Sequence, residues 1–138
     1  MPHVTVATRA RALLARLNDP KDVAAVRCVC VCLILAECVL CSLIVWRVPY
    51  TEIDWRAYMD EVGGYLQGER DYRELRGDTG PLVYPAGFVY IYASLKTLTG
   101  GDIFLGQCAF VGVYLIHLAI VLAVYAQARC VPPWALLT

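Results

Sequence analysis

The chain has 138 residues and no net charge, because 12 Lys and Arg side chains balance 12 Asp and Glu side chains. A neutral chain gives no electrostatic reason to expect a nucleic-acid partner. Hydrophobic residues make up 59% of the sequence, and they gather in three blocks instead of spreading as they would through a soluble core. This distribution predicts an all-α integral membrane protein with about three transmembrane helices.

The N-terminal segment, residues 1–22, precedes the first apolar block and is predominantly basic. The positive-inside rule therefore places it in the cytoplasm. Residues 7–17 mix apolar side chains with arginines, which suits either a short amphipathic helix on the membrane surface or an unstructured tail. The basic side chains at this end of the chain are Arg9, Arg11, Arg16, Lys21 and Arg27.

Two of the apolar blocks, 23–46 and 103–126, are long enough to cross a bilayer as helices. The middle block, 82–98, is at the lower limit of spanning length. Residues 99–102 read Thr-Gly-Gly-Asp, which predicts a tight cytoplasmic turn that pairs the second and third spans. Residues 127–138 would then be luminal and would contain the start of a further span. That order leaves Arg129 on the lumenal side, in mild conflict with the positive-inside rule.

Polar residues within the apolar blocks can have either a structural or a functional role. Glu37 lies near the middle of the first span, where an ionisable group is costly. A bond to a neighbouring helix, or protonation, is favoured there over a functional role. Six of the seven cysteines also fall inside spans, and they are expected to be free thiols and not metal ligands.

The segment between the first two spans, 47–81, is charged and would be lumenal. Thr51-Glu52-Ile53-Asp54 has the form of a capping box. It predicts a helix from about Glu52 to Val62, which Gly63-Gly64 would end. Gly77-Asp78-Thr79-Gly80-Pro81 predicts a turn.

The predicted helix in this segment is amphipathic. One face carries an apolar stripe, and an adjoining face is polar. Such a helix suits the membrane interface, with its apolar side turned toward lipid or protein. The apolar stripe is Trp55, Met59, Val62 and Leu66, and the polar face is Asp54, Tyr58 and Glu61.

The carboxylates of this segment are the candidates for chemistry, because neither a zinc-binding, nor a P-loop, nor a Ser-His-Asp pattern is present. Most of them have arginines nearby and suit a solvated surface. On the residues alone, Asp54 is slightly more easily explained as a helix cap than as a catalytic group.

Two stretches, TEIDWRAYMDEV and GDTGPLVYPAGFVYIY, resemble the family of endoplasmic-reticulum α-1,3-mannosyltransferases that use dolichyl phosphate mannose. The resemblance is close over about 40 residues. It implies a GT-C-type membrane glycosyltransferase that extends the five-mannose dolichyl-diphosphate oligosaccharide of asparagine-linked glycosylation. It also implies a multi-pass protein of the endoplasmic reticulum membrane whose partners are these two lipid-linked sugars and the bilayer, with no cofactor and no metal.

The resemblance also implies roles for residues of the lumenal segment. Asp54 would be the catalytic base that takes the proton of the acceptor hydroxyl. An inverting transfer from a sugar phosphate needs no general acid, since phosphate leaves as an anion. Cations near the site would stabilise that phosphate, and Arg47, Arg56 and Arg76 are candidates by charge. The residues expected to bind substrate are Trp55, Arg56, Tyr58, Glu61, Asp78 and Tyr84.

Family members have many more spans, so the chain is interpreted as a truncated isoform or fragment. We expect the 138 residues alone to show no transfer activity, because too little protein is present to enclose two lipid-linked sugars. The alternative functions are a non-catalytic membrane fragment or a small membrane adaptor.

Overall fold

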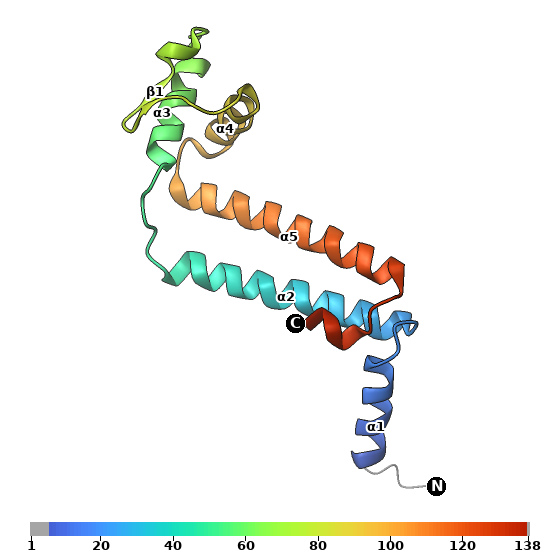
Figure 1. The fold of residues 1–138 in the computed structure, drawn as a ribbon. Helices are drawn as coiled ribbons and strands as arrows, with labels where there is room; N and C mark the ends of the chain where they lie inside the picture. The colour runs from blue at the N-terminus through green and yellow to red at the C-terminus, as the bar shows by residue number, and fades with distance from the viewer. Residues whose placement is uncertain (1–5, 138) are drawn as a thin grey trace. The chain divides into compact units, whose positions relative to one another are not determined.

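The computed structural model describes residues 6–137, which are mostly helical (Figure 1). The chain divides into two compact units. We call residues 6–43 with 111–137 the span unit, and Ile44–Phe110 the loop unit. The elements in chain order are α1 (Val6–Leu17), α2 (Val23–Arg47), α3 (Trp55–Leu66), the 3₁₀ turn η1 (Tyr72–Glu74), β1 (Arg76–Gly77), β2 (Gly80–Pro81), α4 (Ala86–Thr99), α5 (Ile103–Ala128) and η2 (Pro133–Leu137).

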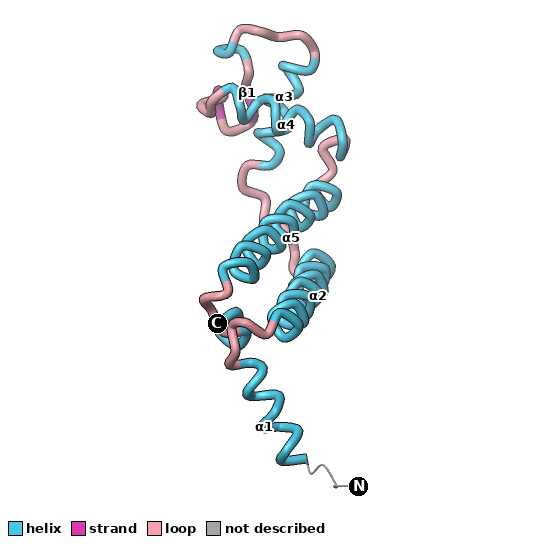
Figure 2. Tube along the Cα trace, turned by 90° about the vertical axis from the view of Figure 1, so that its right-hand side faces the viewer, coloured by secondary structure: helices cyan, strands magenta, loops and turns pink. Residues whose placement is uncertain are grey.

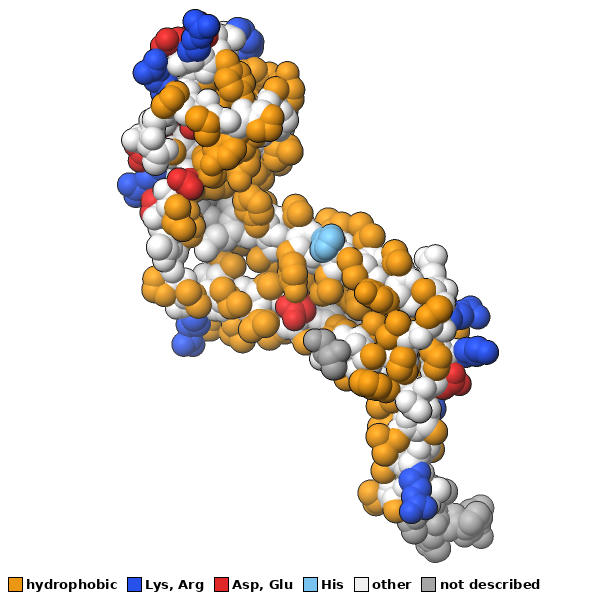
Figure 3. All heavy atoms as spheres, in the orientation of Figure 1, with side chains coloured by type: hydrophobic (Ala, Val, Ile, Leu, Met, Phe, Trp, Pro, Cys, Tyr) orange, Lys and Arg blue, Asp and Glu red, His pale blue; other side chains and the backbone are white. Residues whose placement is uncertain are grey.

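The two longest helices, α2 and α5, match the first and third expected spans. They contain 25 and 26 residues with mean hydropathies of 2.8 and 2.3. Within residues 6–137, they are the two helices long and apolar enough to cross a membrane. Their apolar side chains cover the face seen in Figure 3, and outward-facing examples include Leu35 and Ile116. An apolar exterior of this kind suits lipid as the surrounding solvent.

In the span unit, α2 and α5 run antiparallel and side by side (Figure 2). The Tyr114 hydroxyl of α5 donates a hydrogen bond of 3.0 Å to Oε2 of Glu37. This contact confirms the expectation that Glu37 bonds to a neighbouring helix. Toward the other end of the pair, Leu122 is buried and lines a cavity together with Val26 and Cys30. The end of α5 therefore lies beside the start of α2.

The middle apolar block does not form a third helix of that length. The helix in it, α4, has 14 residues and is therefore about 21 Å long, against a hydrocarbon layer of about 30 Å. Pro85 occupies its N-cap position, and Gly100 ends it in the left-handed conformation at φ 65°. The structure thus supplies two of the three expected spanning helices.

The helix α3 begins and ends at other residues than the sequence predicted. It begins at Trp55 and ends at Leu66, whereas the capping-box pattern and Gly63-Gly64 predicted 52–62. Thr51 lies outside the helix, so the capping box does not form. The Glu52 carboxylate instead accepts the Arg56 amide at 3.2 Å.

The two glycines lie within α3 because they permit close packing there. A Cβ added at Gly63 would come within 2.6 Å of Nζ of Lys96, and one at Gly64 within 3.3 Å of Leu75. The Lys96 ammonium also donates to the Met59 carbonyl at 2.6 Å. Tertiary contacts therefore outweigh the low helix propensity of glycine at these positions.

The predicted turn at residues 77–81 is confirmed as the tip of a small antiparallel hairpin. Arg76 pairs with Pro81 and Gly77 with Gly80, and Gly80 adopts a φ of 126° that favours glycine. The hairpin is flanked by Leu75 and Leu82, which form a buried cluster with Val89 of α4. This cluster joins the hairpin to α4.

The apolar stripe of α3 faces protein along most of its length. Trp55, Met59 and Val62 are buried, whereas Leu66 is 48% exposed. Trp55 also donates from Nε1 to the Gly101 carbonyl at 2.9 Å. The stripe is therefore the packing surface of the loop unit.

The two ends of the described chain are helical as well. Residues 6–17 form α1, none of whose residues is buried, so the helical alternative for this segment is correct. Of the C-terminal residues expected to begin a further span, Pro133–Leu137 form the 3₁₀ helix η2, and Thr138 lies outside the described residues.

The contact between the hairpin and α3 yields a stability prediction. A Cβ at Gly77 would come within 2.5 Å of the Ala57 backbone oxygen, which cannot move without distorting α3. Gly77→Ala should therefore lower the free energy of unfolding by about 1–3 kcal/mol. Thermal unfolding of the chain in detergent, followed by far-UV circular dichroism, measures the effect.

Gly87→Ala is the matched control, because nothing lies within 4 Å of its added Cβ. Alanine at this helical position should leave stability unchanged or raise it by up to about 1 kcal/mol. Equal unfolding temperatures for the two variants would contradict the proposed packing.

Candidate active site

Asp54 immediately precedes α3, at the N-cap position, and is partly exposed. Its side chain makes no capping hydrogen bond, although a helix cap was the simpler interpretation of the sequence. Glu52 supplies that bond instead. No backbone amide of residues 6–137 therefore donates to the Asp54 carboxylate.

Tyr58, one turn further along α3, links Asp54 to Tyr84. Its hydroxyl donates to Oδ2 of Asp54 at 3.2 Å and lies 3.0 Å from the Tyr84 hydroxyl. Since Tyr58 has one hydroxyl proton and the carboxylate can only accept, Tyr84 is the donor in the second bond. Burial, the negative charge of Asp54 and the hydrogen bond that Tyr58 donates to Asp54 raise the pKa of Tyr58. Tyr58 therefore stays protonated at neutral pH and orients the Asp54 carboxylate.

A stack of aromatic rings borders these polar groups. Tyr84 stacks on Phe88 with centroids 4.6 Å apart, and Phe88 stacks on Tyr92 at 4.2 Å. Tyr58 meets all three rings edge-on, at 5.0–5.4 Å. We call Tyr58, Tyr84, Phe88 and Tyr92 the aromatic wall. Phe88 and Tyr92 were not among the predicted site residues, although the four-residue spacing from Tyr84 would have placed them on one side of a helix.

Glu61, two turns after Asp54, is a buried carboxyl group. It is 3% exposed, and its Oε2 has no hydrogen-bond partner among the described residues. Burial, followed by the charge of Asp54, raises the pKa of Glu61. Desolvation disfavours the charged form of such a group. Two carboxyl groups on one face of α3 thus have different environments, one at the partly exposed helix start and one in the protein interior.

The other predicted site residues have varied positions. Trp55 is buried and bonded to Gly101. Arg56 is exposed, with its Nε 3.8 Å from Glu52. Asp78 is exposed in the hairpin turn, and no interaction joins it to Asp54 in residues 6–137. The structure therefore brings together Asp54, Tyr58 and Tyr84, and it leaves Asp78 apart from that group.

The two remaining arginine candidates are also at the surface of the loop unit. The Arg47 guanidinium lies 4.1 Å from the centroid of the Trp46 ring. Arg76 lies 3.8 Å from the Glu74 carboxylate and donates to the Arg73 carbonyl. Residues 6–137 contain no group of three or more His, Cys, Asp or Glu placed to hold a metal ion.

The environment of Glu61 predicts a pH dependence of stability. Because its folded-state pKa is raised above the unfolded value of about 4.3, its contribution to stability is complete below that unfolded value. The contribution is lost as the pH rises through the folded-state pKa. Glu61→Gln should remove this loss, as measured by unfolding temperature between pH 4 and pH 8. Asp60→Asn, at an exposed neighbour, should keep the wild-type slope, and an unchanged slope in Glu61→Gln would contradict the assignment.

Comparison with known proteins gives consistent matches. The model of the family described as "ALG3 protein" matches residues 31–138. A curated protein of Arabidopsis thaliana is 55% identical over 104 residues, which is 75% of this chain and 24% of that protein. A Neurospora crassa protein is 55% identical over 102 residues, covering 72% and 23%, and a Homo sapiens protein is 51% identical over 108 residues, covering 77% and 25%.

All three relatives are named Dol-P-Man:Man(5)GlcNAc(2)-PP-Dol alpha-1,3-mannosyltransferase. The chain spans about a quarter of their length. No solved structure matches it at a significant level.

Proposed function

The chain belongs to the ALG3 protein family, and from that premise we propose that it carries the base of an α-1,3-mannosyltransferase. The donor is dolichyl phosphate mannose and the acceptor is the five-mannose dolichyl-diphosphate oligosaccharide, as in the names of the relatives. One observation carries the proposal. The Asp54 carboxylate has no capping role and is oriented by Tyr58 beside the aromatic wall.

Asp54 acts as the general base. The acceptor hydroxyl oxygen forms a bond to C1 of the mannose while the bond from C1 to the phosphate oxygen breaks. The hydroxyl proton passes to Asp54, and the electron pair of the broken bond leaves with dolichyl phosphate. No acid is required, because the phosphate leaves as an anion. A carboxylate at a partly exposed helix start is accessible to a hydroxyl from outside the protein.

Tyr58 and Tyr84 position that base and contact the sugar. The hydrogen bond from Tyr58 fixes which Asp54 oxygen faces the acceptor, and the remaining carboxylate lone pairs stay open. Tyr84 lies at the exposed edge of the aromatic wall, where its ring and hydroxyl are available to a sugar. Trp55 has a structural role and does not contact the sugar, since its side chain is buried and its hydrogen bond to Gly101 holds the start of α3 in place.

Arg56 is the arginine best placed to meet the leaving phosphate. It lies in the first turn of α3, two residues after Asp54, and its pairing with Glu52 at 3.8 Å is exposed. Exposed pairs of this kind contribute little to stability, so a phosphate can replace Glu52 as the partner. Glu61 and Asp78 remain proposed substrate-binding residues.

We place the loop unit at the lumenal surface of the endoplasmic reticulum membrane, with two spans instead of three. α2 crosses from the cytoplasm to the lumen, α3 and α4 stay on the lumenal side, and α5 returns. The antiparallel pairing of α2 and α5 supports this order. It also returns Arg129 to the side of the basic N-terminus, in agreement with the positive-inside rule. A base near the bilayer suits two substrates tethered by polyisoprenyl chains, as in GT-C-type transferases.

The two-span order predicts where glycosylation tags are modified. A sequon introduced near Gly68 should be glycosylated in microsomes, because the loop unit is lumenal. A sequon near Thr8 and one in a tag fused after Thr138 should both remain unmodified. Modification of the C-terminal tag together with the Gly68 sequon would support three spans and contradict the proposed order. Modification at Thr8 but not at Gly68 would reverse the orientation and remove the lumenal base.

If Asp54 is the catalytic base, replacing its carboxylate by an amide should cause a large loss of mannose transfer. In a full-length family member, the Asp54→Asn equivalent should lower mannose transfer by about 10²–10⁴-fold, because an amide accepts no proton at neutral pH. Transfer to the five-mannose lipid-linked acceptor in microsomes is the measurement. Asp60→Asn is the matched control, since Asp60 is exposed on the same helix. Near-normal transfer by Asp54→Asn at normal expression would rule out Asp54 as the base.

A further inference from the structure

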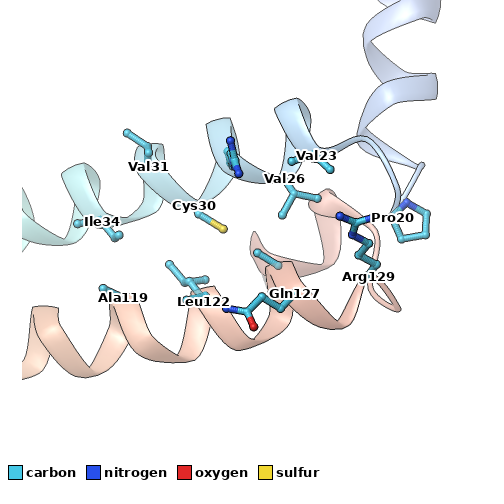
Figure 4. Close-up of a pocket in the computed structure, with 13 residues that line it drawn as sticks. Pro20, Val23, Val26, Cys30, Val31, Ile34, Ala119, Leu122, Gln127 and Arg129 are labelled. Carbon is cyan, nitrogen blue, oxygen red and sulfur yellow. The ribbon is translucent and has the colours of Figure 1, made fainter.

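The span unit contains a cavity that the proposed transfer reaction does not use (Figure 4). It lies between α2 and α5 and has a volume of about 710 Å³, within the range of small-molecule sites. Val26, Cys30 and Leu122 point into it from the two helices (Figure 4). Arg27 and Arg129 line its other part, near the start of α2 and the end of α5.

The cavity has an apolar wall about as deep as one bilayer leaflet. Its lining runs along α2 from Val23 to Ile34, a rise of eleven residues and therefore about 16 Å along the helix. Half of a hydrocarbon layer of about 30 Å is nearly the same depth. The opposite wall comes from α5 and includes Leu122. An acyl chain that enters from one leaflet would thus contact apolar side chains over its length.

The arginines supply positive charge where the two spans end. Within residues 6–137, neither Arg27 nor Arg129 forms an ion pair with a carboxylate. Arg129 has a φ of 51°, which is uncommon for a residue with a side chain, and this conformation reverses the chain just after α5. In Figure 4 its side chain lies beside Pro20 at the end of the cavity.

The acidic side chains closest in sequence are already engaged. Asp22 accepts from Nε of Arg16 at 2.7 Å and from the Ala25 amide at 2.9 Å. Asp19 accepts the Lys21 amide at 2.9 Å. The two guanidinium groups of the cavity are therefore available to an external anion, and a phosphate group matches the paired donors of arginine.

We propose that this cavity binds one anionic phospholipid, with the phosphate at Arg27 and Arg129 and an acyl chain between α2 and α5. Basic pockets between transmembrane helices are known to bind the head groups of anionic lipids. The proposed lipid site requires that α2 and α5 lie in a bilayer. It does not depend on which side of the membrane the N-terminus faces. It is separate from the transfer reaction, so failure of either proposal leaves the other standing.

The test measures retention of single lipids by the 138-residue chain, using native mass spectrometry from a neutral detergent. Dioleoylphosphatidylserine should be retained roughly 10- to 30-fold better than dioleoylphosphatidylcholine, as expected for two arginines near a membrane surface. Dihexanoylphosphatidylserine should bind weakly because its chains are short. Inorganic phosphate should not displace the long-chain lipid. Equal retention of the serine and choline lipids would overturn the proposal, as would displacement by phosphate.

Variants test the two parts of the site separately. Arg27→Gln with Arg129→Gln should abolish the preference for the serine lipid. Arg9→Gln with Arg47→Gln removes the same charge outside the cavity and should keep the preference. Leu122→Trp should fill the apolar part and lower retention with both arginines present. Far-UV circular dichroism verifies the helix content of each variant. If the glutamine pair unfolds, the double variant Arg27→Lys with Arg129→Lys replaces it, and it should retain part of the preference for the serine lipid. Wild-type preference in a folded glutamine pair would refute the assigned contacts.

Discussion

Gly77 lies directly against the backbone of Ala57, and the geometry of the loop unit depends on this contact. A side chain at residue 77 would overlap the Ala57 carbonyl, so the hairpin can approach α3 this closely only with glycine there. Leu75 and Leu82, on either side of the hairpin, then reach Val89 in α4. The chain leaving the hairpin carries Tyr84 to within hydrogen-bond distance of Tyr58. The orientation of the Asp54 carboxylate thus follows from backbone packing about one turn along the helix.

The span unit depends on a different kind of interaction. An ionisable side chain inside a bilayer is costly unless it has a partner, and Glu37 finds one in Tyr114. Apart from this bond, α2 and α5 present apolar side chains on most of their surfaces. Lipid provides little hydrophobic driving force between such helices. This polar contact therefore does much to define how the two helices pair, and the cavity near their arginine-bearing ends follows from that pairing.

The elements with long apolar runs could be predicted well, and those set by packing could not. The sequence predicts α2 and α5 to within two residues at each end, because a long unbroken apolar run predicts one continuous helix. It misplaces both ends of α3, since the cap signal at Thr51 and the glycine pair are local cues. Lys96 and Leu75 fill the space above those glycines, and that packing continues the helix to Leu66. The middle apolar block similarly forms only a 14-residue helix, because Pro85 and Gly100 limit it.

The sequence by itself determined that the chain is helical and apolar, that a charged segment separates its apolar runs, and that this segment contains a helix with Asp54 near its start. These properties follow from composition, periodicity and single residues, which act locally. Only the structure decided that Asp54 is no cap, that Tyr58 bonds its carboxylate while Tyr84 bonds Tyr58, and that Glu61 is buried. It also decided that α5 returns alongside α2. The bond from Tyr84 to Tyr58, the burial of Glu61 and the pairing of the two long helices depend on contacts between residues far apart in the chain, whose geometry no local pattern of residues specifies.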